Sequence, residues 1–228
     1  MIDEIQSQFF APDILEFNNK RIINIENLLL PISGKTILEP GCGPGLISKY
    51  FYNNNCKVFP LEGRKEIVSF VKENNPSSNI ITFDLENDNW DNLPTCDISI
   101  AYGILYHLSD PLKFIDNLFK KTNEFCVIET VVSLDTAEDN NNVVIENNCI
   151  NQALNKLGCR PTRKHIWNYL ISKFTYVYMP LKQTEHSQFP KQFKISEDYI
   201  ARCIFIGSKV KLDIPTLSSS FITEYYTS

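Results

Sequence analysis

The residues of this sequence best suited to chemistry are three glycines and the acid that precedes them. Gly41, Gly43 and Gly45 alternate directly after a short apolar run, and an apolar-periodic segment follows them. The acid Glu39 lies two residues before the first glycine. Glycine tolerates positive φ, and without a Cβ its main chain can approach a ligand closely. This order of residues predicts a strand, a ligand-binding turn that presents backbone amides, and then a helix.

The spacing of the glycines bears on the class of ligand. A dinucleotide site has the pattern GxGxxG, in which the third glycine lets the helix pack against the strand. Here the third glycine comes one place early, and Leu46 stands where that pattern has glycine or alanine. The carboxylate of Glu39 would repel a pyrophosphate, whereas it suits a ligand that carries ammonium and sulfonium charges. A glycine turn of purely structural use is the alternative.

Two segments resemble sequence motifs of one enzyme family. Residues 39–45 resemble motif I, (D/E)xGxGxG, of the class I S-adenosylmethionine (SAM) dependent methyltransferases. The segment GILYHLSDP, residues 103–111, closely resembles the (G)VLYHLxDP segment of many class I methyltransferases, among them sugar, small-molecule and some tRNA-uridine modifying enzymes. Residues 160–190 resemble, more loosely, a C-terminal module of some bacterial methyltransferases. Together these likenesses cover most of the chain from Gly34 to Ser208, and they imply SAM as the cofactor.

The resemblance implies an α/β fold with a doubly wound, mostly parallel seven-stranded sheet and helices on both faces. In such folds ligands bind beyond the carboxyl ends of the strands. We expect residues 1–33 to form a helical segment that covers the cofactor site, and residues 34–210 to form the methyltransferase domain. Residues 211–228 are expected to be a C-terminal tail.

Apolar patterning and helix or turn signals predict the remaining elements. Pro60 cannot donate to a ladder, so we expect a bulge or the end of a strand there. The acidic, asparagine-rich stretch 133–148 is predicted to be a loop or flexible lid beside the active site. Gly158 is expected to end a helix. Strands are predicted at residues 57–61, 79–83, 97–101, 125–130, 176–179 and 199–206, and helices at residues 64–74, at 149–157 and from Asp110 and Thr162 onward.

Acids follow several of the predicted strands at their carboxyl ends. Glu62 ends the second strand, where a carboxylate can accept both ribose hydroxyls of an adenosine ligand. The resemblance implies that Asp84 receives the adenine amino group and that the next backbone amide meets the ring; an ordinary loop acid is the alternative. The residues predicted to bind the cofactor are Glu39, Gly41, Cys42, Gly43, Gly45, Glu62, Gly63, Arg64, Asp84, Leu85, Tyr102 and Gly103.

Methyl transfer from SAM requires an aligned acceptor, and a base where the acceptor is a hydroxyl. His107 is the first choice for that base because an imidazole titrates near neutral pH. A hydrogen bond to backbone or cofactor is its alternative role. Glu129 and His186 are the further choices for the base. The residues predicted to line the acceptor pocket are Tyr106, Arg163, Trp167, Tyr176 and His186, although aromatic residues at such spacing commonly form core.

The composition is ordinary for a globular protein of 228 residues, with 43% hydrophobic and 21% charged residues. Seven scattered cysteines without a CxxC pair, together with only three histidines, favour reduced thiols and argue against a metal cage. No apolar run is long enough to span a membrane, and the first residues contain acids where a signal peptide has basic residues. We therefore predict a cytoplasmic protein without a membrane partner or an evident metal site.

The charge distribution bears on the methyl acceptor. The formal net charge of −5 argues against general nucleic-acid binding. Residues 156–194, however, carry eight lysines and arginines and one acid, so this basic and aromatic segment either faces an anionic substrate or is a solvated surface. We favour a hydroxyl or amine of a small molecule or sugar as the acceptor, with a tRNA base as the alternative. From another class, a SAM-binding module without catalysis or a dinucleotide oxidoreductase stays open.

Overall fold

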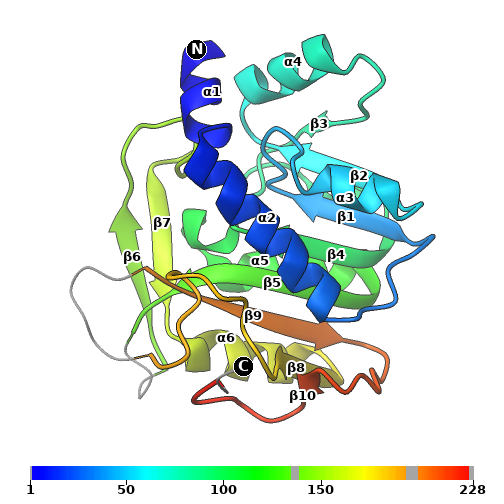
Figure 1. Cartoon of the computed structure of the whole chain (residues 1–228), viewed down its shortest axis with the longest axis vertical. Helices are drawn as coiled ribbons and strands as arrows, with labels where there is room; N and C mark the ends of the chain where they lie inside the picture. The colour runs from blue at the N-terminus through cyan, green and yellow to red at the C-terminus, as the bar shows by residue number, and fades with distance from the viewer. Residues whose placement is uncertain (1, 135–138, 194–199, 226–228) are drawn as a thin grey trace.

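An eight-stranded sheet forms the centre of the computed structural model, which describes residues 2–134, 139–193 and 200–225 (Figure 1). The strands lie in the order β10-β8-β9-β5-β4-β1-β2-β3. From β3 to β5 neighbouring strands are parallel, whereas β9 is antiparallel to both β5 and β8. The predicted mostly parallel α/β sheet is confirmed, with one strand more than the seven expected. The bounds are β1 Thr36–Pro40, β2 Lys57–Glu62, β3 Ile81–Thr82, β4 Cys96–Tyr102, β5 Thr122–Val132, β8 Tyr176–Pro180, β9 Ala201–Ser208 and β10 Leu217–Ser218.

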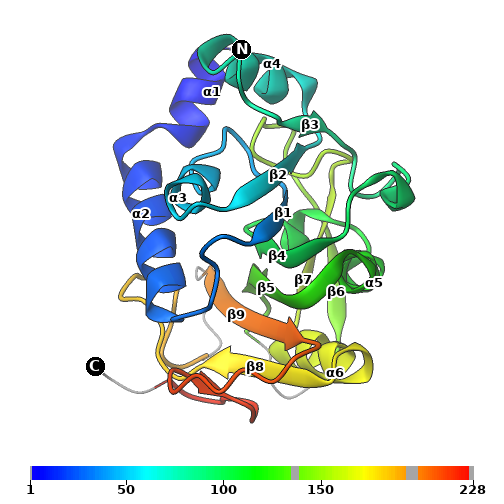
Figure 2. The same ribbon diagram turned by 90° about the vertical axis from the view of Figure 1, so that its right-hand side faces the viewer.

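Helices cover both faces of this sheet (Figure 2). The helices α2 and α3 pack on one face, and α5 and α6 pack on the other. At one end of the molecule α1 packs against α4 through Ile5 and Ile67. None of the helices in the described ranges is long and apolar enough to cross a membrane. The bounds are α1 Ile2–Phe9, α2 Pro12–Asn27, α3 Ser48–Asn53, α4 Lys65–Asn74, α5 Pro111–Lys121 and α6 Arg163–Lys173, with short 3-10 helices η1 Trp90–Asn92 and η2 Leu105–His107.

The central strands are apolar on both sides because helices cover both sides. Along β4, Ile100 belongs to the core beneath α2 and α3, whereas its neighbour Ala101 belongs to the core beneath α5 and α6. In β5, Val127 and Ile128 divide between the two cores in the same way. This alternation is the period of two that a strand imposes on its side chains. It fixes the strands firmly, so the residues that follow them are held at defined positions.

The predicted starts of α5 and α6 are confirmed by their caps. The Asp110 side chain accepts a hydrogen bond from the Lys113 amide, and Pro111 occupies the first helical turn. The Thr162 side chain accepts one from the His165 amide in the same way. The first cap fixes the start of α5 shortly after η2 and the end of β4.

Strands β6 (Asn141–Ile145) and β7 (Leu157–Pro161) form a separate antiparallel pair, the β6–β7 hairpin, which corrects two predictions. The stretch 133–148 contains β6 where a loop or lid was expected, although its residues 135–138 lie outside the described residues. The helix expected at 149–157 is wrong, because turns occupy most of that range. The β6 strand escaped prediction because it faces solvent and has no apolar alternation. Its last residue, Ile145, is 86% exposed.

Gly158 lies inside β7 and does not end a helix. A Cβ at this position would lie 2.5 Å from the Tyr106 carbonyl oxygen and 2.6 Å from a carboxylate oxygen of Glu146. The β6–β7 hairpin therefore packs on η2 at a distance that only glycine permits. This contact brings the hairpin to the carboxyl end of β4.

Pro60 lies in an unbroken strand, so the expected bulge or strand end is wrong. β2 continues to Glu62 and stays in register with β1, with Pro60 opposite Glu39. The Leu61 carbonyl points toward β1, where it accepts from the Gly41 amide. Because successive residues of a strand direct their backbone groups to opposite neighbours, the backbone nitrogen of Pro60 faces the β3 side. β3 pairs with β2 only from Leu61 onward. On the β3 side, no described strand therefore pairs with β2 at the position where the amide hydrogen of Pro60 is missing, and no inter-strand hydrogen bond is lost.

The segment after Ser208, expected to be a tail, packs on the body of the protein as far as residue 225. Leu212 and Tyr225 are buried, and β10 pairs with β8. The Thr216 hydroxyl donates to the carbonyl of Leu28 at the end of α2. This segment therefore closes one edge of the sheet and one end of α2.

Candidate active site

The turn after β1 has the backbone that its glycines predict. Gly41, Gly43 and Gly45 have φ values of +70°, +55° and +81°. A Cβ on Gly41 would lie 2.5 Å from the Ile104 side chain, so the turn and the segment after β4 approach each other as closely as the chain allows. The helix that follows, α3, begins only at Ser48 and is six residues long.

Two adjoining cavities open at the carboxyl ends of β1, β2 and β4. The larger has a volume of about 360 Å³ and the smaller about 120 Å³. Both are lined by the glycine turn, by Phe9 of α1 and by His107 of η2. The larger cavity extends from Glu39 toward α2 and β9, and the smaller extends from Glu62 toward the turn after β3. They form one continuous site with two ends.

The smaller cavity holds the acids predicted to bind an adenosine. Glu62 accepts hydrogen bonds from the Gly43 amide at 3.1 Å and the Arg64 amide at 2.8 Å, which ties the end of β2 to the glycine turn. Burial raises the pKa of Glu62, although these amides act in the opposite direction. Asp84 also lines this cavity, and its carboxylate accepts from the Glu86 and Asn87 amides within its own turn.

Glu39 lies at the base of the larger cavity. Its side chain is buried and accepts a hydrogen bond from the Ser48 hydroxyl. Burial raises the pKa of Glu39 to about 8, and the hydrogen bond from Ser48 offsets part of that rise. At neutral pH the carboxyl is therefore mostly protonated until a cation approaches it.

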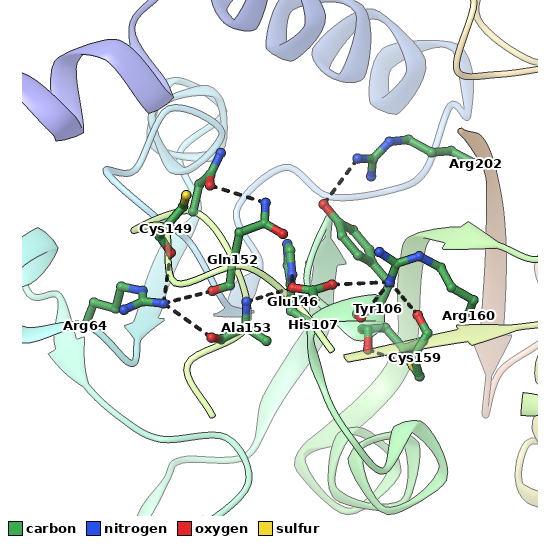
Figure 3. A network of polar contacts seen from close by, with 12 residues as sticks. Arg64, Tyr106, His107, Glu146, Cys149, Gln152, Ala153, Cys159, Arg160 and Arg202 are labelled. Atoms are coloured by element: carbon green, nitrogen blue, oxygen red, sulfur yellow. Dashed lines mark hydrogen bonds and ion pairs between the residues drawn. The ribbon is translucent and has the colours of Figure 1, made fainter. Parts of the chain in front are cut away.

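The structure brings nearly all of the predicted cofactor residues together. Gly45 is the exception, because it lies behind the turn and lines neither of these two cavities. Arg64 lines the smaller cavity, and its guanidinium donates to the carbonyls of Cys149, Gln152 and Ala153 in the connection between β6 and β7 (Figure 3). The predicted residues that line one cavity or both are Glu39, Gly41, Cys42, Gly43, Glu62, Gly63, Arg64, Asp84, Leu85, Tyr102 and Gly103.

His107 lines both cavities and pairs with an acid that sequence reasoning missed. Its Nδ1 lies 2.5 Å from the Oε2 atom of Glu146 in the β6–β7 hairpin (Figure 3). Glu146 is buried and also accepts from the Ala153 amide and from Arg160. Its position within an acidic stretch read as a loop gave no signal that it faces a histidine.

The pKa shifts of this pair define its protonation. Burial lowers the pKa of His107, and this outweighs the hydrogen bond to Glu146, which raises it. Burial alone would raise the pKa of Glu146, but the hydrogen bond to His107 and the nearby guanidinium of Arg160 lower it overall. A neutral imidazole beside a carboxylate must carry its proton on Nδ1, because the carboxylate can only accept. Nε2 of His107 is then a lone-pair acceptor, as a general base requires.

Glu129 is committed to two ion pairs, which argues against its predicted role as a base. Its carboxylate accepts from Arg21 of α2 at 2.7 Å and from Arg202 of β9 at 3.0 Å. Burial would raise the pKa of Glu129, but the two guanidiniums lower it overall. The carboxylate is fully buried and does not line either cavity. Its place is to hold the two arginines, which do line the larger cavity.

Sequence reasoning also missed Arg160 and Arg202. Arg202 of β9 donates to the Tyr106 hydroxyl at 3.2 Å, and Arg160 of β7 donates to the Tyr106 carbonyl (Figure 3). The signal for Arg202 was available, since it is a single charge within an apolar strand. Arg160 belongs to the basic segment 156–194, and nothing in the sequence distinguishes it from the other cations there.

Of the residues predicted to contact the acceptor, only Tyr106 lines either of these two cavities. Arg163 is buried, and its guanidinium lies 3.6 Å from the centre of the Phe193 ring. Trp167 packs against Phe221, and Tyr176 stacks on Tyr178 in the same strand, β8. His186 lies against Phe17, with the ring centres 4.9 Å apart, and reaches the larger cavity only through that neighbour.

Comparisons with known proteins agree with this geometry. Residues 38–124 match the family model of a methyltransferase domain. A comparison with curated proteins found no match. Among solved structures, the N-terminal domain of EvdMO1, determined in the presence of S-adenosylhomocysteine (SAH) and D-fucose, is 16% identical with a TM-score of 0.62, over 84% of this chain and 81% of that one.

Two further solved structures share the fold. A SAM-dependent methyltransferase from Aquifex aeolicus is 17% identical with a TM-score of 0.57, over 91% of this chain and 98% of that one. The 1,6-didemethyltoxoflavin-N1-methyltransferase of Burkholderia thailandensis, determined with 1,6-didemethyltoxoflavin and SAH bound, is 10% identical with a TM-score of 0.53, over 86% and 81%. Residues 38–124 thus match a methyltransferase domain, and the chain shares its fold with these SAM-dependent methyltransferases.

Proposed function

We propose that this protein transfers the methyl group of SAM to a hydroxyl or amine of a small molecule, with His107 as the general base. The observation that carries the proposal is the pairing of His107 with Glu146 where the two cavities meet. The smaller cavity suits the adenosine part of the cofactor, and the larger offers room for both the methionine part and an acceptor.

The chain's own residues fit the cofactor in three respects. At Gly41 and Gly43 no Cβ lies between the main chain and the cavities, and the Cβ that Gly43 lacks would meet only the Phe9 ring, at 3.4 Å. Glu62 offers two carboxylate oxygens toward a ribose diol. Glu39 can ionise in response to the positive charges of SAM, because its pKa of about 8 lies close to neutral pH.

SAM supplies a methyl carbon already activated by its sulfonium sulfur. The protein must align the acceptor with that carbon and, for a hydroxyl, remove a proton as the new bond to oxygen forms. Nε2 of His107 receives this proton while the carbon–sulfur bond breaks and SAH leaves. Glu146 stabilises the resulting imidazolium through Nδ1, and solvent then takes up the proton.

A small acceptor is favoured over RNA by the fate of the basic segment 156–194. Three of its eight cations are used within the fold: Arg160 lies in the larger cavity, Arg163 is buried, and Lys173 forms an ion pair with Asp116. RNA binding depends on arrays of exposed cations that neutralise phosphates. Two of the structural relatives were determined with small molecules, D-fucose and 1,6-didemethyltoxoflavin, which supports the same choice.

The test uses the purified full chain, methyl-labelled SAM and a cell extract divided into nuclease-treated and untreated portions. We expect labelled product of low molecular mass in both portions and in equal amounts. Label that disappears after nuclease treatment would establish an RNA acceptor instead. Tight SAM binding without label in any fraction would favour a non-catalytic binding module, and NAD or FAD bound to the purified protein would reject SAM as the cofactor.

A further inference from the structure

We propose that the larger cavity binds an acceptor that carries an anionic group, a carboxylate or a phosphate, and that Arg160 and Arg202 hold this group beside the ring of Tyr106. The inference rests on the proposed methyl transfer but concerns only the class of acceptor. It divides the acceptor into two parts, a reacting hydroxyl or amine at His107 and an anion at the two arginines.

The lining of the larger cavity is cationic. Arg21, Arg160 and Arg202 reach it from three separate elements, α2, β7 and β9. Among the described residues that line it, Glu39 is the sole acid, and it lies at the glycine turn, where it faces the proposed cofactor and not the arginines. A carboxylate or phosphate entering this cavity therefore meets donors and positive charge on three sides.

The carboxylates that pair with these arginines do not neutralise all of their positive charge. Glu129 is one charge shared between Arg21 and Arg202, and Glu146 is shared between Arg160 and the neutral His107. Three guanidiniums therefore face two ionised carboxylates. SAM, which carries a sulfonium, an ammonium and one carboxylate, brings one net positive charge, and an ionised Glu39 offsets it, so the excess charge of the guanidiniums is left. Buried charges are stable when they are paired, so an anion on the acceptor completes the balance.

The two arginines also have donors to spare. Among the described residues, Arg202 donates one hydrogen from each of its three nitrogens, to Gln188, Glu129 and Tyr106, and two of its five hydrogens have no partner there. Arg160 donates through Nη1 alone within the described part of the chain, and its side chain is 32% exposed. The planar guanidinium fork matches the oxygens of both carboxylate and phosphate.

Two buried polar groups in the wall of the larger cavity also support a polar acceptor. The Nε of Arg21 and the hydroxyl of Tyr102 are buried and have no hydrogen-bond partner among the described residues. Both side chains line the larger cavity. Buried donors without partners are uncommon in folded proteins, and here they lie in a wall that a polar acceptor would contact.

The ring of Tyr106 places the anion close to the base. The centre of this ring lies 5.4 Å from the Arg160 guanidinium carbon, 5.0 Å from that of Arg202 and 4.0 Å from the centre of the His107 ring. An acceptor can therefore reach His107 with its hydroxyl and the arginines with its anion only if the two groups are a few bonds apart. Hydroxy acids and sugar phosphates have this form.

The experiment follows methyl transfer from labelled SAM into the low-molecular-mass pool of a cell extract, with the product separated on an anion exchanger at neutral pH. We expect the labelled product to be retained, and phosphatase treatment to show whether a phosphate or a carboxylate retains it. Arg160→Gln should lower transfer about tenfold or more, because a charge-assisted contact is lost, and leave SAM affinity within about twofold. Lys182→Gln, which removes a charge of the same basic segment outside this cavity, is the matched control.

A labelled product that passes through the exchanger would overturn the proposal, and so would full activity of Arg160→Gln. If no product forms although SAM binds, the proposed methyl transfer fails and the anion site is judged separately. SAH-loaded protein is then heated with inorganic phosphate or with acetate. Stabilisation of the wild type and of Lys182→Gln, but not of Arg160→Gln, would support the site. Equal responses of all three proteins would reject it.

Discussion

Both ends of the active site contain buried acids, but the surroundings shift the pKa values of these acids in opposite directions at the two ends. At the cofactor end, burial raises the pKa of Glu39 to about 8 and raises that of Glu62, because no cation is near enough to oppose it fully. At the acceptor end, burial acts on Glu129 and Glu146 in the same direction, but arginines and a histidine lower both pKa values. Acids of the first kind remain available to a cationic ligand, whereas acids of the second kind are already used to position other side chains.

The first way to break this comparison is to close the cofactor end. Gly43→Val places a branched side chain at φ +55°, facing the cavities, and we expect SAM affinity to fall more than about 100-fold through strain and occlusion. Calorimetry measures the loss, and circular dichroism checks the fold. Gly34→Ala is the control, since it shares positive φ but meets nothing within 4 Å. Unchanged affinity in a folded Gly43→Val protein would contradict the assignment of the turn.

Removing the base should affect the acceptor end alone. For a hydroxyl acceptor, His107→Ala is expected to lower kcat by roughly 10² to 10⁴, the usual contribution of a general base, with SAM affinity nearly unchanged. Single-turnover rates with labelled SAM measure the effect. His165→Ala, on α6 outside both cavities, should leave the rate unaltered. A His107→Ala protein with the wild-type rate would remove His107 from catalysis.

A smaller effect is expected when the base keeps its place but loses its partner. Glu146→Gln should lower kcat by about tenfold, because the imidazolium loses a charge-assisted hydrogen bond. Glu146 raises the pKa of His107, so its removal should move the rising limb of kcat against pH to lower pH. Asp139→Asn, which alters the partner of the half-buried His165, is the control. A lower rate with an unmoved limb would limit Glu146 to holding the hairpin.

The smallest predicted effect concerns the raised pKa of Glu39. In the free protein its carboxyl titrates near pH 8, and SAM favours the ionised form, so binding should release a proton. SAM affinity should therefore rise by several-fold up to about tenfold as pH increases from 7 to 9. Because the amino group of SAM titrates in the same range, the comparison is between wild type and Glu39→Gln. Parallel pH profiles of the two proteins would show that Glu39 does not respond to SAM.

The cofactor end could be predicted from sequence because each part of it follows one strand directly. The glycine turn follows β1, Glu62 ends β2 and Asp84 follows β3, so local patterns sufficed. The acceptor end is assembled from α2, η2, the β6–β7 hairpin and β9, which are distant in sequence. Residue type misled there: Arg163 is as basic as Arg160 and only three positions away, but it lies beneath Phe193.

The missing side chain of Gly158 has a consequence for how this site can be altered. At Gly158 the β6–β7 hairpin touches η2. A methyl group at this position would push the hairpin off η2 and move Glu146 away from His107. The solvent-exposed strand β6 of the same hairpin is not packed closely in this way. We therefore expect that substitutions in β6 can adapt the larger cavity to other acceptors, whereas any side chain at position 158 will abolish its function.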